Sequence, residues 1–198
     1  MAQGHKEQVL SLFKECDALL QGHFKLTSGK HSEWYFEKIR LIEKPHILEK
    51  IIDLLIDQIK SDKKEFEYVV SPAYGAIAIG FLAALKLGKN FAFTQRVDEK
   101  MSLRGGFAGI DGSKAVIVED ILTTGSSITE VIECLKQKNV SFSGVYCLVD
   151  RSAGEVLIEG KPVGSLLSLK VDAFEPEVCP FCRAGVPLTK PGASDKKN

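Results

Sequence analysis

The chain has 198 residues, and its 26 Lys and Arg balance 26 Asp and Glu to a formal net charge of zero. That length favours one compact domain, and zero net charge gives no basis for binding a nucleic acid or an anionic membrane. No stretch approaches the ~20 apolar residues of a membrane span, and the N-terminus lacks the pattern of a signal peptide. We therefore expect a cytoplasmic protein whose basic groups act locally, on a small anion.

The first part of the chain predicts two helices with a pair of strands between them. Residues 6–20 carry apolar side chains at helical spacing. Short strands at 24–26 and 34–36, joined by a turn, fit a flap. Residues 45–60 have a broad apolar face, with Pro45 suited to the first turn of a helix.

From residue 68 onward, strands and helices alternate. The predicted strands are 68–71, 91–94, 115–118, 144–149 and 166–171, and the predicted helices are 75–87 and 127–138. Apolar strands without alternation, separated by helices, predict an α/β fold with a parallel central sheet flanked by helices. Ligands bind such sheets beyond the carboxyl ends of the strands. Three such places are 71–75, 119–127 and 150–151.

The sharpest signal follows the strand at 115–118. It consists of Glu119, Asp120, Ile121, Leu122, Thr123, Thr124, Gly125, Ser126 and Ser127. A glycine lets the backbone approach a ligand, and the free N–H groups of a new helix attract an anion such as a phosphate monoester. The two carboxylates can accept hydrogen bonds from sugar hydroxyls or hold Mg²⁺ through water.

Two other interpretations of this segment explain less of it. Ser127 and Glu130 have the spacing of a capping box, which we expect to form as well, but it does not explain two acids followed by Thr-Thr-Gly-Ser-Ser. Other phosphate loops do not fit, because the lysine of a P-loop and the pattern G-x-G-x-x-G are missing.

The segment 119–127 resembles the phosphoribosyl pyrophosphate signature of type I phosphoribosyltransferases. Three further segments resemble orotate phosphoribosyltransferases in particular. They are Gly22–Gly29 with Ser32 and Tyr35-Phe36, then Val149-Asp150-Arg151, and the tail from Cys179 to Leu188. The resemblance extends from about residue 8 to residue 192. It implies one domain over 1–198, with a small N-terminal hood (1–43), a core (44–175) and a C-terminal tail (176–198).

The resemblance also implies a homodimer in which the loop 96–106 closes over the neighbouring subunit. Arg96 and Lys100 match the family's pyrophosphate-binding arginine and catalytic lysine, and Asp120 belongs to the same catalytic set. Ser102 stands where a histidine is common, and Arg104 is a candidate for the missing charge. The alternative is that these are solvated surface charges.

Further residues are assigned by the same resemblance. Arg151 is expected to bind the carboxylate of orotate, the alternative being an ion pair with Asp150. Tyr35 and Phe36, with Thr123, are candidates to contact the pyrimidine, although either aromatic ring could simply pack the hood. Tyr74 matches the family's pyrophosphate site, whereas Thr27 and Gly75 stand where many members have lysine. Backbone N–H groups around Gly75 would then bind pyrophosphate.

These assignments imply transfer of 5-phosphoribosyl from phosphoribosyl pyrophosphate to orotate, with Mg²⁺ held by Glu119 and Asp120 together with the substrate. The alternatives are transfer to another base, such as a purine, and a non-catalytic regulator that binds phosphoribosyl pyrophosphate. The five cysteines do not suggest a disulfide scaffold. Cys179-x-x-Cys182 lacks the second pair or histidines of a zinc site, which favours a reduced turn over metal or redox use.

Overall fold

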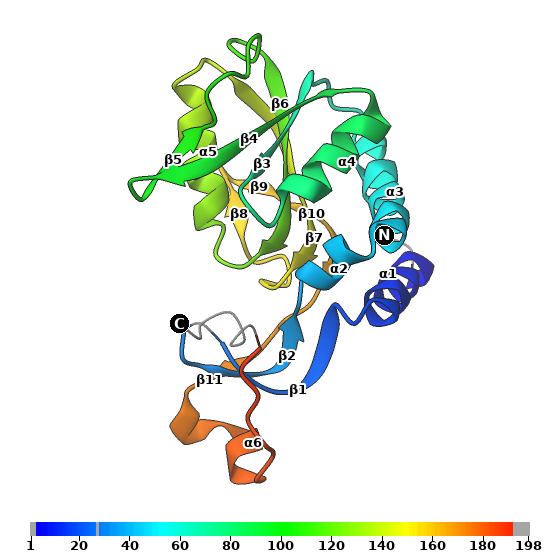
Figure 1. Ribbon diagram of the computed structural model, residues 1–198, viewed down its shortest axis with the longest axis vertical. Coiled ribbons are helices and arrows are strands. Elements are labelled where there is room, and N and C mark those ends of the chain that lie inside the picture. Colours follow the sequence, from blue (N-terminus) through cyan, green and yellow to red (C-terminus); the bar gives the residue numbers. More distant parts are fainter. Residues whose placement is uncertain (1–2, 27, 192–198) are drawn as a thin grey trace.

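The computed structural model describes residues 3–26 and 28–191, and the side chains from residue 6 onward. Its centre is a six-stranded sheet in the order β10-β7-β6-β3-β4-β5 (Figure 1). All neighbours pair in parallel except β4 and β5. The strands are β3 (Tyr68–Pro72), β4 (Asn90–Val97), β5 (Lys100–Leu103), β6 (Lys114–Leu122), β7 (Ser141–Asp150) and β10 (Gly164–Ser168). The predicted α/β fold with a parallel sheet is confirmed.

Both faces of the sheet are buried, which explains why its strands lack alternation. In β6, Val116 and Val118 pack with one set of helices, whereas Ala115 and Ile117 pack on the other side. The helices α1 (Gln3–Glu15), α3 (Pro45–Ser61) and α4 (Ile77–Leu87) cover the first face, and α5 (Ser126–Lys136) covers the second (Figure 1). A two-strand unit of β8 (Leu157–Ile158) and β9 (Lys161–Pro162) lies beside α5.

A second, antiparallel sheet forms the hood below the core in Figure 1. It contains β1 (Leu19–Lys25), β2 (His31–Phe36) and β11 (Ala173–Phe174), and α2 (Ile39–Glu43) connects it to α3. The C-terminal part, with the short helices η1 (Pro176–Val178) and α6 (Pro180–Arg183), folds back onto β1. There Thr189 N donates to His23 O at 2.8 Å, and Lys25 N donates to Thr189 O at 2.9 Å.

Two predictions about secondary structure are wrong. The first helix was expected to reach residue 20, but it ends at Glu15 because Asp17 takes a left-handed conformation (φ 53°) and Ala18 N donates to Phe13 O. Residues 19 and 20 belong to β1 instead. The connection after residue 97 was expected to lack regular structure, but Asp98 and Glu99, both with positive φ, form a tight turn between β4 and β5.

The other predicted elements are confirmed, with boundaries that differ by a few residues. In the described part of the chain, none of the helices combines the length and the apolar character needed to cross a membrane.

Candidate active site

The loop between β6 and α5 forms a small cup. Gly125 precedes the first turn of α5 with φ 78°, and an added Cβ would lie 2.8 Å from Ile158 Cδ1, so a side chain is excluded there. Thr129 N then donates to Gly125 O, which starts the helix. The predicted capping box is wrong: α5 has no side-chain cap, and Glu130 instead binds Arg96.

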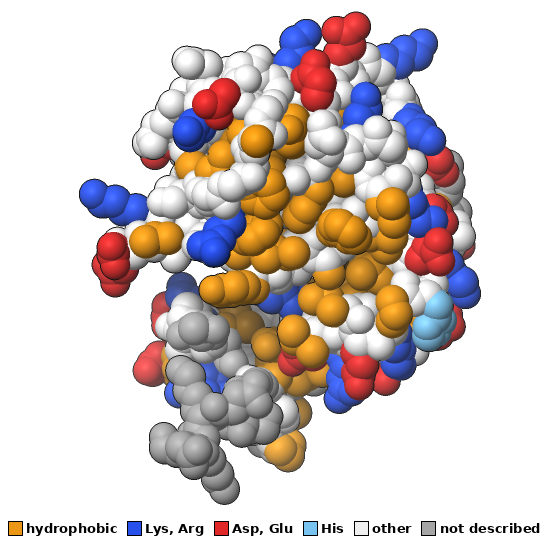
Figure 2. Space-filling view, turned by 45° about the horizontal axis from the view of Figure 1, so that its top comes forward, with side chains coloured by type: hydrophobic (Ala, Val, Ile, Leu, Met, Phe, Trp, Pro, Cys, Tyr) orange, Lys and Arg blue, Asp and Glu red, His pale blue; other side chains and the backbone are white. Residues whose placement is uncertain are grey.

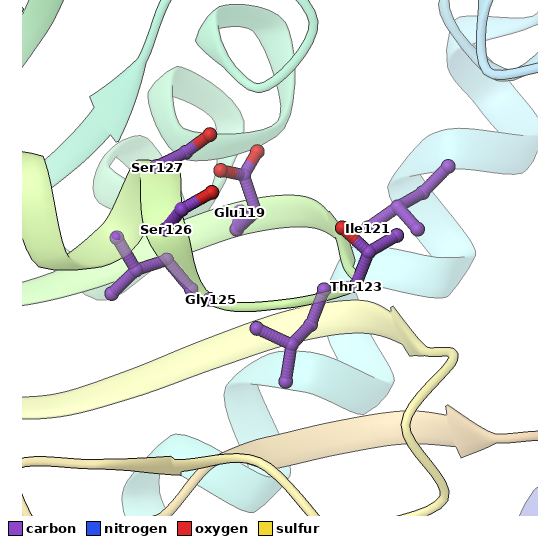
Figure 3. A pocket seen from close by; sticks show the side chains of 8 residues that line it. Glu119, Ile121, Thr123, Gly125, Ser126 and Ser127 are labelled. Atoms are coloured by element: carbon purple, nitrogen blue, oxygen red, sulfur yellow. The ribbon is translucent and has the colours of Figure 1, made fainter. Parts of the chain in front are cut away.

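The cup has the chemistry of an anion site. It is a pocket of about 200 Å³ lined by residues 119, 121–123 and 125–128. Figure 3 shows the hydroxyls of Ser126 and Ser127 and the carboxyl group of Glu119 directed toward the same side of the loop. The first turn of α5 contains no acidic residue, so its free N–H groups offer positive potential and hydrogen bonds to a phosphate.

Two carboxyl groups in β6 lie beside this cup. Asp120 is only 5% exposed, accepts a hydrogen bond from Ile121 N at 2.7 Å, and forms an ion pair with Lys38 Nζ at 2.7 Å. Glu119 accepts from Asp120 N at 3.0 Å. Burial, followed by the neighbouring charge of Asp120, raises the pKa of Glu119 well above its usual range. Without substrate the pair therefore carries less than its full negative charge near neutral pH.

Because the pKa of Glu119 is raised, we expect the free energy of unfolding of the substrate-free protein to fall as the pH rises above the range in which an ordinary Glu titrates. As pH rises past about 4.3, the unfolded chain loses this proton while folded Glu119 keeps it, so stability falls up to the folded-state pKa. Glu119→Gln removes the penalty, and thermal unfolding should show a gain of at least about 1.5 kcal/mol at pH 8. The gain should vanish near pH 4. The exposed Glu133→Gln on α5 is the control; equal effects of both substitutions would contradict the assignment.

A larger cleft opens next to the cup and gathers eight of the predicted site residues. Its volume is about 770 Å³, including its open mouth. Residues from β6 and α5 form one wall, the β3–α4 loop forms another, and single side chains come from the hood, from β4 and from the end of β7. The lining is Lys38, Pro72, Ala73, Tyr74, Gly75, Arg96, Met101, Glu119, Asp120, Ile121, Thr123, Ser127 and Arg151.

Lys38 is a cleft residue that the sequence analysis missed. It lies just before α2, and its ammonium group reaches Asp120. A Cβ added to Gly75 would lie 2.4 Å from Lys38 Nζ and 2.1 Å from Asp120 Oδ2. Lys38 thus occupies the space where a side chain at position 75 would begin. The sequence points to Lys38 only indirectly, through the absence of a lysine at position 75, where the family resemblance leads one to expect it.

Arg151 lies in the cleft without a carboxylate partner among the described residues. The alternative of an ion pair with Asp150 is wrong, because Asp150 accepts hydrogen bonds from Ser152 N, Ser152 Oγ and Gly154 N. Burial lowers the pKa of Arg151. A partly desolvated guanidinium group without a counter-charge is suited to an anionic ligand.

The hairpin β4–β5 divides the predicted lid residues between two faces. Arg96 and Met101 are paired across the hairpin and line the cleft, and Arg96 Nη1 lies 2.8 Å from Glu130 Oε2. Side chains alternate along a strand, so Lys100 and Ser102 lie on the opposite face. Neither they nor Arg104 line this chain's own cleft.

The hood aromatics pack against other aromatic rings, Phe36 on α1 and Tyr35 on β1. Phe36 meets Phe13 edge-on at 4.9 Å, and Tyr35 lies 5.6 Å from Phe24. Burial raises the pKa of Tyr35. Neither ring lines the cleft, and Thr27 lies outside the described residues.

Comparisons with known proteins agree with this architecture. A family model described as "Phosphoribosyl transferase domain" matches residues 40–178. The orotate phosphoribosyltransferase of Caldicellulosiruptor bescii is 39% identical over 97% of this chain and 100% of its own length. That of Carboxydothermus hydrogenoformans is 40% identical, over 92% of this chain and 95% of its own.

Among solved structures, orotate phosphoribosyltransferase from Aeropyrum pernix superimposes with a TM-score of 0.67 at 28% identity, over 82% of this chain and 94% of that one. Adenine phosphoribosyltransferase from Thermoanaerobacter pseudethanolicus, at 16% identity and a TM-score of 0.57, shares the fold. The loop, the fold and these relatives agree, and the chain belongs to the orotate phosphoribosyltransferase family of type I phosphoribosyltransferases.

Proposed function

We propose that this protein transfers the 5-phosphoribosyl group from phosphoribosyl pyrophosphate to orotate, giving orotidine 5'-monophosphate and pyrophosphate in pyrimidine (UMP) synthesis. The observation that carries the choice of base is Arg151, a partly buried guanidinium that has no counter-charge within residues 3–26 and 28–191. It shares one cleft with Glu119, Asp120 and Ser127. A base bearing a carboxylate satisfies Arg151, whereas uracil or adenine leaves it unpaired.

Each part of the site has a role in this reaction. The cup at Thr123–Ser127 holds the 5-phosphate, and Glu119 and Asp120 accept hydrogen bonds from the ribose hydroxyls. The bond from C1 to the pyrophosphate oxygen breaks first, which leaves positive charge on the sugar. A ring nitrogen of orotate then bonds to C1 and gives up its proton to water or to the departing pyrophosphate. Tyr74, the N–H groups around Gly75, and Arg96 bind the leaving pyrophosphate.

Mg²⁺ fits the donors present, because Glu119 and Asp120 offer the carboxylate oxygens that this ion prefers, directly or through water. Bound together with the substrate, it would neutralise pyrophosphate charge. Omitting Mg²⁺ from the assay should therefore abolish most product formation.

A homodimer is the proposed form of the enzyme, with the lid hairpin of one subunit serving the cleft of the other. Lys100 and Ser102 lie on the hairpin face opposite Arg96, so they suit a neighbouring site better than their own. Figure 2 shows hydrophobic side chains gathered over the middle of the face that carries α4. Phe81 and Leu85 on α4 are 57% and 65% exposed, as expected for side chains that a partner subunit covers. The five free cysteines fit a reducing, cytoplasmic location.

A panel of bases tests the proposal directly. Product formation from phosphoribosyl pyrophosphate and Mg²⁺ should occur with orotate and not with uracil, adenine, guanine or hypoxanthine. Turnover of a purine alone would support the alternative transferase, and binding of phosphoribosyl pyrophosphate without turnover of any base would support the regulator.

Arg151→Gln should raise the KM for orotate by about 10–100-fold, since one charge-assisted pair is lost. The KM for phosphoribosyl pyrophosphate should change little, because Arg151 is assigned to the base. Initial rates at varied orotate measure this, with the exposed Arg40→Gln as control. An unchanged KM for orotate would remove Arg151 from base recognition.

A further inference from the structure

A second cluster of metal-binding side chains lies in the hood, away from the cleft. It combines His23 of β1, His31 of β2, and Cys179 and Cys182 at the two ends of α6. The ligand atoms of all four lie within 4.8 Å of one another. The sequence analysis found no histidine partner for the two cysteines, because the histidines come from the other end of the chain: His31 and Cys182 are 151 positions apart.

Four of the separations within the cluster are within a few tenths of an ångström of those in a tetrahedral zinc site. His23 Nε2 lies 3.0 Å from His31 Nδ1, 3.5 Å from Cys179 Sγ and 3.7 Å from Cys182 Sγ. Cys182 Sγ lies 3.2 Å from His31 Nδ1. Zinc bonds of about 2.0–2.1 Å to nitrogen and about 2.3 Å to sulfur place tetrahedral ligand atoms about 3.3–3.8 Å apart.

The surroundings orient the ligands and shield three of them from water, while Cys182 is exposed at the outer side of the cluster. His23 Nδ1 lies 2.8 Å from Val186 O, which fixes the proton there and turns the free electron pair of Nε2 toward the cluster. Cys179, His23 and His31 are 0%, 2% and 4% exposed. The ring of Phe181 lies 5.7 Å from that of His23 and forms part of the cover.

Burial of His23, His31 and Cys179 needs an explanation that hydrogen bonds alone do not provide. Thiols are weak donors, so two buried imidazoles that face sulfur atoms keep poorly satisfied lone pairs. A disulfide between Cys179 and Cys182 would account for the two sulfur atoms but would leave both imidazoles facing the disulfide without a partner for their lone pairs. Nitrogen and thiolate ligands in tetrahedral array favour zinc over Mg²⁺ or Ca²⁺.

We propose that His23, His31, Cys179 and Cys182 bind one Zn²⁺, which fastens the C-terminal segment to the hood. With four protein ligands the site is closed and structural. The ligands come from chain positions far apart in sequence and meet only in the folded chain, so the free energy of zinc binding stabilises the fold. It also anchors β2, the strand that leads to Lys38 in the cleft.

Metal content of the full chain tests the proposal. Purified under reducing conditions and loaded with Zn²⁺, the wild type should keep about one zinc per chain after gel filtration, as expected for a complete ligand set. Cys179→Ser/Cys182→Ser and His31→Gln should retain less than about a tenth of that, because the site loses ligands. Cys134→Ala and His46→Gln, which alter a cysteine and a histidine outside the cluster, should keep the full amount.

Cobalt loading and thermal unfolding identify the site independently of the variants' folding. Co²⁺ bound to the wild type should show the thiolate charge-transfer and visible bands of a tetrahedral sulfur-ligated ion. Stripping the wild type with a chelator should lower its Tm by about 5–10 °C, restored by Zn²⁺ and not by Mg²⁺. A wild type without zinc, a Cys179–Cys182 disulfide, or full zinc retention by the double cysteine variant would each overturn the proposal.

Discussion

Replacing Lys100 by alanine should lower turnover by about 1,000-fold while leaving the fold intact. Lys100 is exposed at the tip of the β4–β5 hairpin, opposite Val97, so its loss leaves no cavity and no buried charge. Its ammonium group is assigned to the departing pyrophosphate, where charge is greatest in the transition state. The kcat for orotidine monophosphate formation measures the effect, and the unfolding temperature measures the fold. The exposed Lys50→Ala on α3 is the control.

Mixing two inactive variants tests whether Lys100 acts in the cleft of its own subunit or in that of the neighbouring subunit. Lys100→Ala and Asp120→Asn are each expected to be nearly inactive alone. If the lid crosses between subunits, half of the reshuffled dimers are mixed and one of their two sites is intact, so about a quarter of wild-type activity returns. Mixed dimers, verified by mass, that stay inactive would show that Lys100 acts within its own subunit.

The fold could be predicted well from the sequence because its main signal is local. Strand β6 is apolar on both faces, with Ala115 and Ile117 packing on one side and Val116 and Val118 on the other. Such a run is typical of a strand covered by helices. The predicted strand stopped at residue 118 because two acids follow it, yet β6 continues to Leu122. Glu119 and Asp120 are therefore held by a strand and do not lie in a loop.

The cup could be predicted because its residues are contiguous, whereas residues brought in by tertiary packing could not. Lys38 reaches Asp120 only because the hood folds against the core. The capping-box prediction is also wrong because of a tertiary contact: Arg96 of β4 forms an ion pair with the Glu130 carboxylate. His23 and His31 have no metal-site spacing of their own and meet Cys179 and Cys182 only through the folded tail.

We predict that Lys38 supplies the positive charge that the family resemblance leads one to expect at position 75. Its Nζ lies 2.4 Å from the Cβ that Gly75 lacks, beside the Tyr74 loop assigned to pyrophosphate. Lys38→Ala should lower kcat/KM for phosphoribosyl pyrophosphate by about 100-fold or more, since a charged contact is lost and the buried Asp120 loses its counter-ion. Arg40→Ala, which breaks an exposed ion pair on α2, should change it less than about twofold.

A lysine introduced at position 75 can show whether Lys38 binds pyrophosphate or only pairs with Asp120. In the wild type, Gly75→Lys should be harmful, because its Cβ would lie 2.1 Å from Asp120 Oδ2 and 2.4 Å from Lys38 Nζ. In the Lys38→Ala background the contact with Nζ is gone, and Asp120 Oδ2, released from its ion pair, can turn away from the new Cβ, so that a flexible lysine at position 75 reaches the same space. The double variant should therefore recover about tenfold in kcat/KM and in pyrophosphate affinity over Lys38→Ala, the value of roughly one charged contact.

Two other results would contradict a direct role of Lys38 in binding pyrophosphate. If Gly75→Lys is equally harmful in both backgrounds, the two positions do not share a function. If Lys38→Ala weakens catalysis but leaves the dissociation constant of pyrophosphate unchanged, Lys38 acts through the charge of Asp120 alone. The ammonium group lies next to both the Asp120 carboxylate and Gly75 of the loop assigned to pyrophosphate, so we expect both effects to appear together.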